Sequence, residues 1–359
     1  MVRARPGDAG LDRAVEVVGT SLEGVVLPML DTSRVGEARR AVAALAAGGA
    51  LPEADAGRAQ IVATELAGNL VKHAREGVFH ARLLQPAEGA GLELLAIDRG
   101  PGMDVERCLV DGYSTAGTPG TGLGAARRMS DLFELYSLPS GSVAAARIMA
   151  RGPASTTRAV PALTMELGAV CVAMRGETIC GDAWAVASTP DGRTMVVVAD
   201  GLGHGPFAAE ASSTAIAAFH EQVPLGHGPA EILGEVHRRL RSTRGAAVAV
   251  AEISCSASTI RFSGLGNVAA TVIAGTSRRG LVSHNGTAGA TASTPRELTY
   301  PFPPGAWLIM ASDGLGTHWD LGRYPGVTGS HPALVSGLLG RDFSRGRDDL
   351  TVVSARERS

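Results

Sequence analysis

Three things are scarce in this sequence of 359 residues: cysteine, net charge and long apolar runs. The four cysteines show no C-x-x-C spacing, which argues against a zinc site and fits reduced thiols. A net charge of -2 gives no general reason to bind nucleic acid or an anionic membrane. No run reaches the roughly 18 apolar residues of a membrane span, and the N-terminus lacks the apolar core of a signal peptide. These absences predict a cytoplasmic protein that contacts neither nucleic acid nor membrane.

The length and the 45% hydrophobic content favour two domains of ordinary size. The clearest break in composition is "RGPASTTRAVPAL", which has two prolines, small polar residues and little periodicity. We therefore expect a first domain over residues 1–150, a linker over 151–163 and a second domain over 164–359.

The apolar periodicity differs between the two parts. The first part predicts helices at 56–74 and 122–133 and strands at 79–86, 91–100 and 142–150, which is a mixed helix and sheet domain. The second part predicts helices at 206–221 and 229–242 among a long series of strands. Such a series is typical of stacked antiparallel sheets flanked by helices, so the fold class is α+β.

The tetrapeptide DGLG occurs twice in the second part, at 200–203 and 313–316. Each copy follows an apolar run, so Asp200 and Asp313 each lie at the end of a predicted buried strand. One Asp-Gly pair alone is more often an ordinary turn. However, Asp182 and the pair Asp348 and Asp349 also stand beside strands, and such a group of carboxylates is costly unless cations neutralise it. Oxygen-rich sites select magnesium or manganese.

The ordered set "GD", "ADGLGHG", "SDG" and "RDDLTVV" resembles the SpoIIE-type, RsbX-like branch of the PPM serine/threonine phosphatases, whose fold is an αββα sandwich. The resemblance implies that two Mg or Mn ions activate a water without a covalent phosphoenzyme. It implies that the bridging catalytic acid is Asp200 and that the other metal ligands are Asp182, the Gly201 carbonyl, Asp313, Asp348 and, less firmly, Asp349. His204 follows in the same loop, but a loop histidine is more often only hydrogen-bonded, and it receives no catalytic role.

Two features of the first part go beyond an ordinary amphipathic helix. In "ELAGNLVKHA", Glu65 and Asn69 share one helix face. Asp98 ends a strand in "AIDRGPGM", and a glycine-rich segment then runs into a helix, which suits phosphate binding by backbone N–H groups. Neither a Walker A loop nor a dinucleotide fingerprint is present.

These motifs resemble the GHKL (Bergerat) ATP-binding α/β sandwich, and most closely the anti-sigma-factor kinases of the RsbT and RsbW kind. The resemblance implies ATP with Mg, a catalytic base at Glu65, and Mg on Asn69. It further implies adenine on Asp98, a pocket shaped by Gly100 and Gly102, and phosphates near Gly120, Gly122 and Gly124.

Together the resemblances predict a bifunctional partner-switching regulator of stress response: a serine/threonine kinase module fused to a phosphatase module, both acting on a STAS-domain antagonist protein. A sigma factor or a sensor scaffold is a further possible partner. The alternative is a phosphatase whose ATP-binding module is non-catalytic and only holds a STAS protein or sigma factor. The residues do not decide between them.

Overall fold

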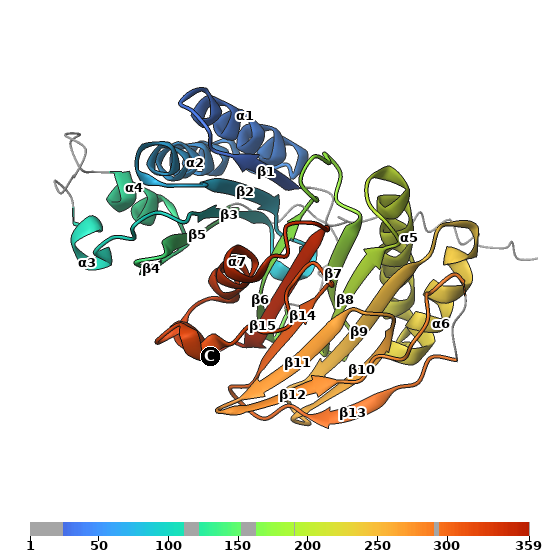
Figure 1. Cartoon of the computed structure of the whole chain (residues 1–359). Helices are drawn as coiled ribbons and strands as arrows, with labels where there is room; N and C mark the ends of the chain where they lie inside the picture. Colours follow the sequence, from blue (N-terminus) through green and yellow to red (C-terminus); the bar gives the residue numbers. More distant parts are fainter. Residues whose placement is uncertain (1–23, 111–121, 152–162, 190, 291–293, 359) are drawn as a thin grey trace, which may run out of the picture.

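The structure is a computed structural model that describes residues 24–110, 122–151, 163–189, 191–290 and 294–358. Within these residues the chain forms three five-stranded antiparallel sheets and a small number of helices (Figure 1). None of the described helices has both the length and the apolar character that crossing a membrane requires.

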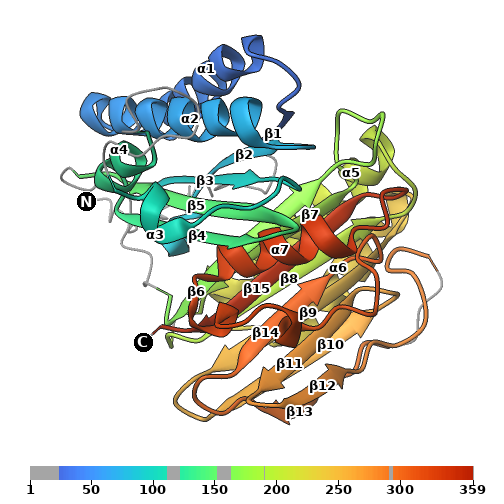
Figure 2. The ribbon, with the colours of Figure 1, turned by 60° about the vertical axis from the view of Figure 1, so that its left-hand side comes forward.

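The N-terminal half contains one sheet with the order β1-β2-β3-β5-β4. Helices α1, α2 and α4 cover one face of this sheet and enclose a hydrophobic core (Figures 1 and 2). Buried side chains recur along α2 at the three- and four-residue spacing of one helix face, as at Val62, Leu66 and Leu70. The elements are β1 (Gly24–Pro28), α1 (Ser33–Gly48), α2 (Glu53–His73), β2 (Val78–Leu83), β3 (Gly91–Ile97), α3 (Val105–Cys108), α4 (Gly122–Met129), β4 (Leu132–Leu138) and β5 (Gly141–Met149).

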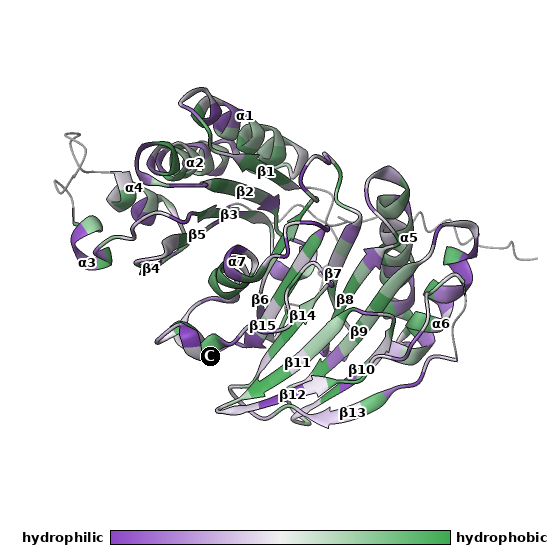
Figure 3. Ribbon diagram, in the orientation of Figure 1, coloured by the Kyte–Doolittle hydropathy of each residue, from purple (hydrophilic) through white to green (hydrophobic). Residues whose placement is uncertain are grey.

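The C-terminal half is a sandwich of two sheets, with the orders β13-β10-β9-β8-β7 and β12-β11-β14-β15-β6. Hydrophobic residues occur along the strands of both sheets (Figure 3), and those buried between the sheets form the inner core. Helices α5 and α6 cover the outer face of the first sheet, and α7 covers the second. The elements are β6 (Met165–Val172), β7 (Asp182–Ser188), β8 (Thr194–Gly201), α5 (Pro206–Gln222), α6 (Pro229–Arg239), β9 (Ala246–Ser254), β10 (Thr259–Leu265), β11 (Ala269–Ala274), β12 (Ser277–Leu281), β13 (Leu298–Pro301), β14 (Trp307–Ala311), α7 (Pro332–Phe343) and β15 (Leu350–Glu357).

Side-chain size follows the two faces of strand β7. Trp184 and Val186 point into the inner core, whereas Ala183 and Ala185 face α5. Strand residues alternate between faces, so small residues on the outer side let the alanine-rich α5 pack close to the sheet. The architecture confirms the predicted α+β class, with an α/β sandwich followed by an αββα sandwich.

Helix α7 packs against both halves of the molecule (Figure 2). One side of α7 contacts β6 and β15 of the sandwich. The other side contacts Leu95, Ile97 and Val143 on the face of the N-terminal sheet that α1, α2 and α4 do not cover. All its residues from Pro332 to Arg341 are buried. One continuous hydrophobic cluster therefore joins the halves.

Some elements differ from the sequence expectation. The helix expected at 122–133 ends at Met129, and residues 132–138 form strand β4 instead. Helices α1 and α7 were not predicted. Helix α7 was missed because it is buried on both sides. It has no polar face, so its sequence lacks the 3.6-residue alternation of polar and apolar residues that predicts a helix. Most of the expected linker, 152–162, lies outside the described residues.

Candidate functional site

Two of the predicted acids lie side by side at one edge of the sandwich. Strands β7 and β8 are antiparallel neighbours, and their register places Asp182 opposite Asp200. Asp182 is only 2% exposed, and its Oδ2 atom has no hydrogen-bond partner. A buried carboxylate oxygen without a donor is costly, unless a cation or water satisfies it.

The second DGLG turn comes from the other sheet and reaches the same place. It follows β14, and its Asp313 lies close enough to Asp200 for the negative charges of Asp313 and Asp348 to act on the Asp200 carboxyl. Asp348 is near Asp313 in turn, since the charge of Asp348 acts on the Asp313 carboxyl. The two DGLG copies therefore meet at one site, together with the end of the segment that leads into β15.

The carboxylates affect one another's protonation. Burial, together with the charges of Asp313 and Asp348, raises the pKa of Asp200 to about 7. Burial and the charge of Asp200 raise the pKa of Asp182 well above its ordinary value. Burial and Asp348 also raise the pKa of Asp313. Such mutual repulsion is the electrostatic signature of a site built to attract positive charge.

Asp349 is held differently from its neighbour Asp348. Its Oδ1 accepts a hydrogen bond from the Met174 N–H at 2.7 Å, and its Oδ2 accepts one from the Gly181 N–H at 2.9 Å. Both oxygens thus anchor the loop between β6 and β7. This arrangement favours Asp348 over Asp349 as the acid that faces a cation.

The glycines of the site are required by close packing. A Cβ on Gly201 would lie 2.1 Å from the Ala208 carbonyl oxygen, and one on Gly314 would lie 2.0 Å from the Asp349 carbonyl oxygen. No other residue type fits these positions without backbone movement. The glycine after each acid therefore lets separate segments approach closely.

The donor set fits a hard divalent cation, because it consists of carboxylate oxygens and includes the orphaned Oδ2 of Asp182. In the described part of the chain, however, no three Asp, Glu, His or Cys side chains converge tightly enough to form a complete metal site by themselves. The acids are adjacent, and the ligand assignment stays a prediction.

Two polar residues of this site were missed from the sequence. The Asn267 side-chain amide donates to Asp313 Oδ2 at 2.6 Å. The Ser312 hydroxyl, which accepts from the Thr351 N–H at 2.9 Å, partly offsets the rise in the pKa of Asp182. The sequence signal for Asn267 is its position directly after β10 and a glycine, since that strand ends at the same edge of the sandwich. His204 pairs with Glu177 at 2.7 Å on the surface, as expected of a hydrogen-bonded loop histidine.

The predicted ATP residues gather around α2 and α4. Glu65 and Asn69 lie one turn apart on α2, and a Cβ on Gly122 would approach Glu65 Oε2 to 2.5 Å. The Glu65 carboxylate therefore reaches the first turn of α4, which also carries the buried Gly124. Gly120 lies outside the described residues.

Asp98 follows β3 and is buried, and its Oδ1 accepts a hydrogen bond from the Gly100 N–H at 2.6 Å. Gly102 has φ +74°, and a Cβ there would lie 2.2 Å from the Leu138 carbonyl oxygen. Glycine is therefore needed at this position. Residues 101–104, together with 137–139, line a cavity of about 320 Å³. Asp98, Gly100 and Gly102 thus belong to one loop beside an open space.

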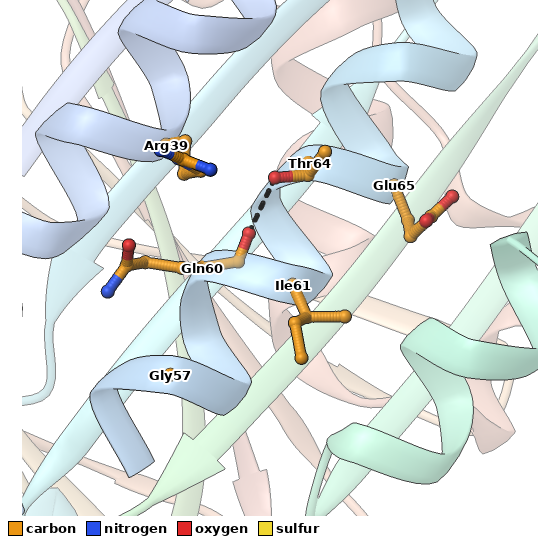
Figure 4. Close-up of a pocket in the computed structure, with 6 residues that line it drawn as sticks. All are labelled: Arg39, Gly57, Gln60, Ile61, Thr64 and Glu65. Carbon is orange, nitrogen blue, oxygen red and sulfur yellow. Dashed lines mark hydrogen bonds between the residues drawn. The ribbon is translucent and has the colours of Figure 1, made fainter. Parts of the chain in front are cut away.

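A second depression, of about 300 Å³, lies beside Glu65 on the outer side of α1 and α2 (Figure 4). Arg39 of α1 borders it, together with Gln60, Ile61 and Thr64 of α2. Ile61 is 44% exposed. Glu65 thus adjoins both the α4 terminus and this depression.

Two protein-family models match the chain. Residues 29–148 match the histidine kinase-like ATPase domain, and residues 190–318 match stage II sporulation protein E (SpoIIE). The chain joins a histidine kinase-like ATPase domain to a SpoIIE domain. Both predicted resemblances are confirmed. The SpoIIE match includes Asp200, Gly201 and Asp313, whereas Asp182, Asp348 and Asp349 lie outside it.

Three relatives are each similar to part of the chain. The chain is 34% identical over 85 residues to the serine/threonine-protein kinase RsbT of Bacillus subtilis (strain 168), a match that covers 23% of this chain and 64% of that protein. A structure from a study of the bacterial stressosome is 26% identical, with a TM-score of 0.49, and covers 54% of this chain and 99% of its own. The RsbU and RsbW domains of a Mycobacterium tuberculosis protein are 20% identical, with a TM-score of 0.46, covering 54% of this chain and 60% of theirs.

Proposed function

We propose that the SpoIIE domain is a metal-dependent phosphoserine/phosphothreonine phosphatase. The observation that carries this proposal is the meeting of Asp182, Asp200, Asp313 and Asp348 at one edge of the sandwich. These acids, with the Gly201 carbonyl, would hold two Mg or Mn ions, and Asp200 would lie between them. Such ions supply a water that is nucleophilic at neutral pH. The Asn267 amide, which donates to Asp313 Oδ2, would orient that carboxylate.

The ATPase domain would be a protein serine/threonine kinase. Glu65 would accept the proton of a substrate hydroxyl, and its access to the depression of Figure 4 supports this role. Asn69 would hold Mg with ATP, Asp98 would bind the adenine, and the α4 terminus would hold phosphate. The alternative is an ATP-binding module without catalysis. Glu65 beside the α4 terminus favours the kinase.

The proposed substrate of both domains is a STAS-domain antagonist protein, as in a partner-switching pathway. The match to the kinase RsbT supports this substrate class. One chain that carries both modules keeps a bound partner at high effective concentration near each of them.

The test uses two variants of the full chain, Asp200→Asn and Glu65→Gln, and two assays with one STAS protein. Asp200→Asn is expected to abolish Mn-dependent hydrolysis of the phosphorylated protein and to retain phosphoryl transfer from ATP. Glu65→Gln is expected to lower transfer by roughly 10²–10⁴-fold and to retain hydrolysis and ATP binding. Unchanged hydrolysis by Asp200→Asn would refute the proposed phosphatase site. Unchanged phosphoryl transfer by Glu65→Gln would refute the role of Glu65 as the catalytic base.

A further inference from the structure

Two cysteines lie in contact beneath the acidic cluster. Cys171 is on β6 and Cys180 is in the loop before β7, and their Sγ atoms are 3.5 Å apart. Both are half-buried free thiols. Among the described residues, the other two cysteines, Cys108 and Cys255, have no thiol within bonding contact.

We propose that Cys171 and Cys180 are a redox-active dithiol that a peroxide oxidises to a disulfide. A disulfide needs an Sγ–Sγ distance of about 2.05 Å, so the two sulfurs need to approach by only about 1.5 Å. Cys180 lies in a loop, and a loop can make this movement more easily than strand β6. Both residues are only partly buried, so a small oxidant such as hydrogen peroxide can reach the pair.

The reaction balances with hydrogen peroxide as the oxidant. One thiol loses its proton, its thiolate sulfur attacks a peroxide oxygen and the O–O bond breaks, which gives a sulfenic acid and a hydroxide that takes up the thiol proton as one water. The second sulfur then displaces the sulfenic oxygen, which leaves as a second water. Two thiols and one hydrogen peroxide thus give one disulfide and two waters, and two electrons pass from sulfur to oxygen.

The pair is positioned to change the acidic site. The residues that follow Cys180 are Gly181, whose N–H donates to Asp349, and Asp182. Cys171 also accepts a hydrogen bond from the Thr351 hydroxyl at 3.3 Å, two residues after Asp349. The loop that a disulfide would close also contains Met174, the second backbone donor to Asp349. Oxidation would therefore pull on the segment that carries Asp182 and on both anchors of Asp349.

The first part of the test is chemical and does not depend on the proposed phosphatase. The reduced full chain is treated with hydrogen peroxide, and its intact mass, alkylatable thiols and cross-linked peptides are measured. The expected product has lost two hydrogens, joins Cys171 to Cys180 and returns to the dithiol with a thiol reductant. Cys108→Ser and Cys255→Ser, the matched controls, should form it, whereas Cys171→Ser and Cys180→Ser should not. A protein that stays fully reduced, gains only oxygen or forms another pair would overturn the proposal.

The second part rests on the proposed function and measures Mn-dependent hydrolysis of an aryl phosphate. Oxidation is expected to lower the rate at least five-fold in the wild type and to leave Cys180→Ser unchanged. If the disulfide forms but the rate does not fall, the proposal that this dithiol controls the acidic site is wrong. If the reduced protein hydrolyses nothing, the proposed phosphatase fails. In that case the second readout is the increase in melting temperature that Mn²⁺ causes in the oxidised and in the reduced protein. An equal increase in both forms would refute the proposal that the dithiol controls the acidic site.

Discussion

The two faces of the N-terminal sheet are covered in different ways. Helices α1, α2 and α4, which precede or interrupt the strands in sequence, cover one face. The other face is covered by α7, from the far end of the chain. Since β3 and β5 are buried on both sides, neither cover can be removed without exposing apolar strands.

The difference shows that the two family domains share a structural element. Polar contacts reinforce the apolar ones at this second face: the His331 N–H donates to Glu134 Oε2 at 2.7 Å, and Arg341 Nη1 donates to the Asp98 carbonyl oxygen at 3.3 Å. Arg341 therefore touches the loop of the candidate adenine site. The family models match two separate regions of the chain, but in the structure these two regions form one packed body.

The largest expected effect comes from separating the halves. Residues 1–151 and 163–359 expressed as two chains should each expose one side of the α7 interface, and we expect each to aggregate alone. Co-expression should restore a soluble complex, because the buried face re-forms. Solubility and size-exclusion chromatography measure this. Two soluble monomeric fragments, each with its own activity, would show that the second face is dispensable.

A smaller effect should come from single side chains in the two cores. Leu338 of α7 and Leu66 of α2 are both almost fully buried, on opposite faces of the sheet. If the faces are equivalent, Leu338→Ala and Leu66→Ala each lower the free energy of unfolding by about 2–5 kcal/mol. Urea denaturation measures both, and each should keep a single transition. A Leu338→Ala loss below about 1 kcal/mol would mean that α7 packs loosely.

The smallest and sharpest effect distinguishes the two sides of α7. A Cβ on Gly337 would lie 2.9 Å from Val143 Cγ1 of the N-terminal sheet, whereas on Gly340 its nearest neighbours, Leu350 and Val170, are at 3.5 Å. Gly340→Ala should be neutral or stabilise by up to about 1 kcal/mol, through helix propensity. Gly337→Ala should instead lose about 1–3 kcal/mol, through overpacking against Val143. Equal melting temperatures for the two variants would argue against this close contact.

The sequence was informative about the candidate sites where local patterns mark them. Asp200 and Asp313 each follow an apolar run and precede a glycine, so a strand-end acid was readable at both positions. Asp182 lies opposite Asp200, and Asp313 near Asp348, because β7 pairs with β8 and β14 pairs with β15. Packing between the two sheets then brings these two pairs together. Asn267 was missed because one amide after one strand carries no periodic signal.

The sequence by itself therefore determined the two family domains, the α+β class, the strand-end acids and the amphipathic helix that carries Glu65 and Asn69. Each of these depends on neighbouring residues along the chain. Only the tertiary structure decided that α7 completes the N-terminal sheet, that Cys171 meets Cys180 and that Asp349 anchors a loop. For α7 and Asp349 the physical reason is that these contacts join residues distant in sequence, and burial of α7 on every side removes the polar and apolar alternation from which a helix is predicted. Cys171 and Cys180 are close in sequence, but only the path of the loop between them decides that their sulfurs meet.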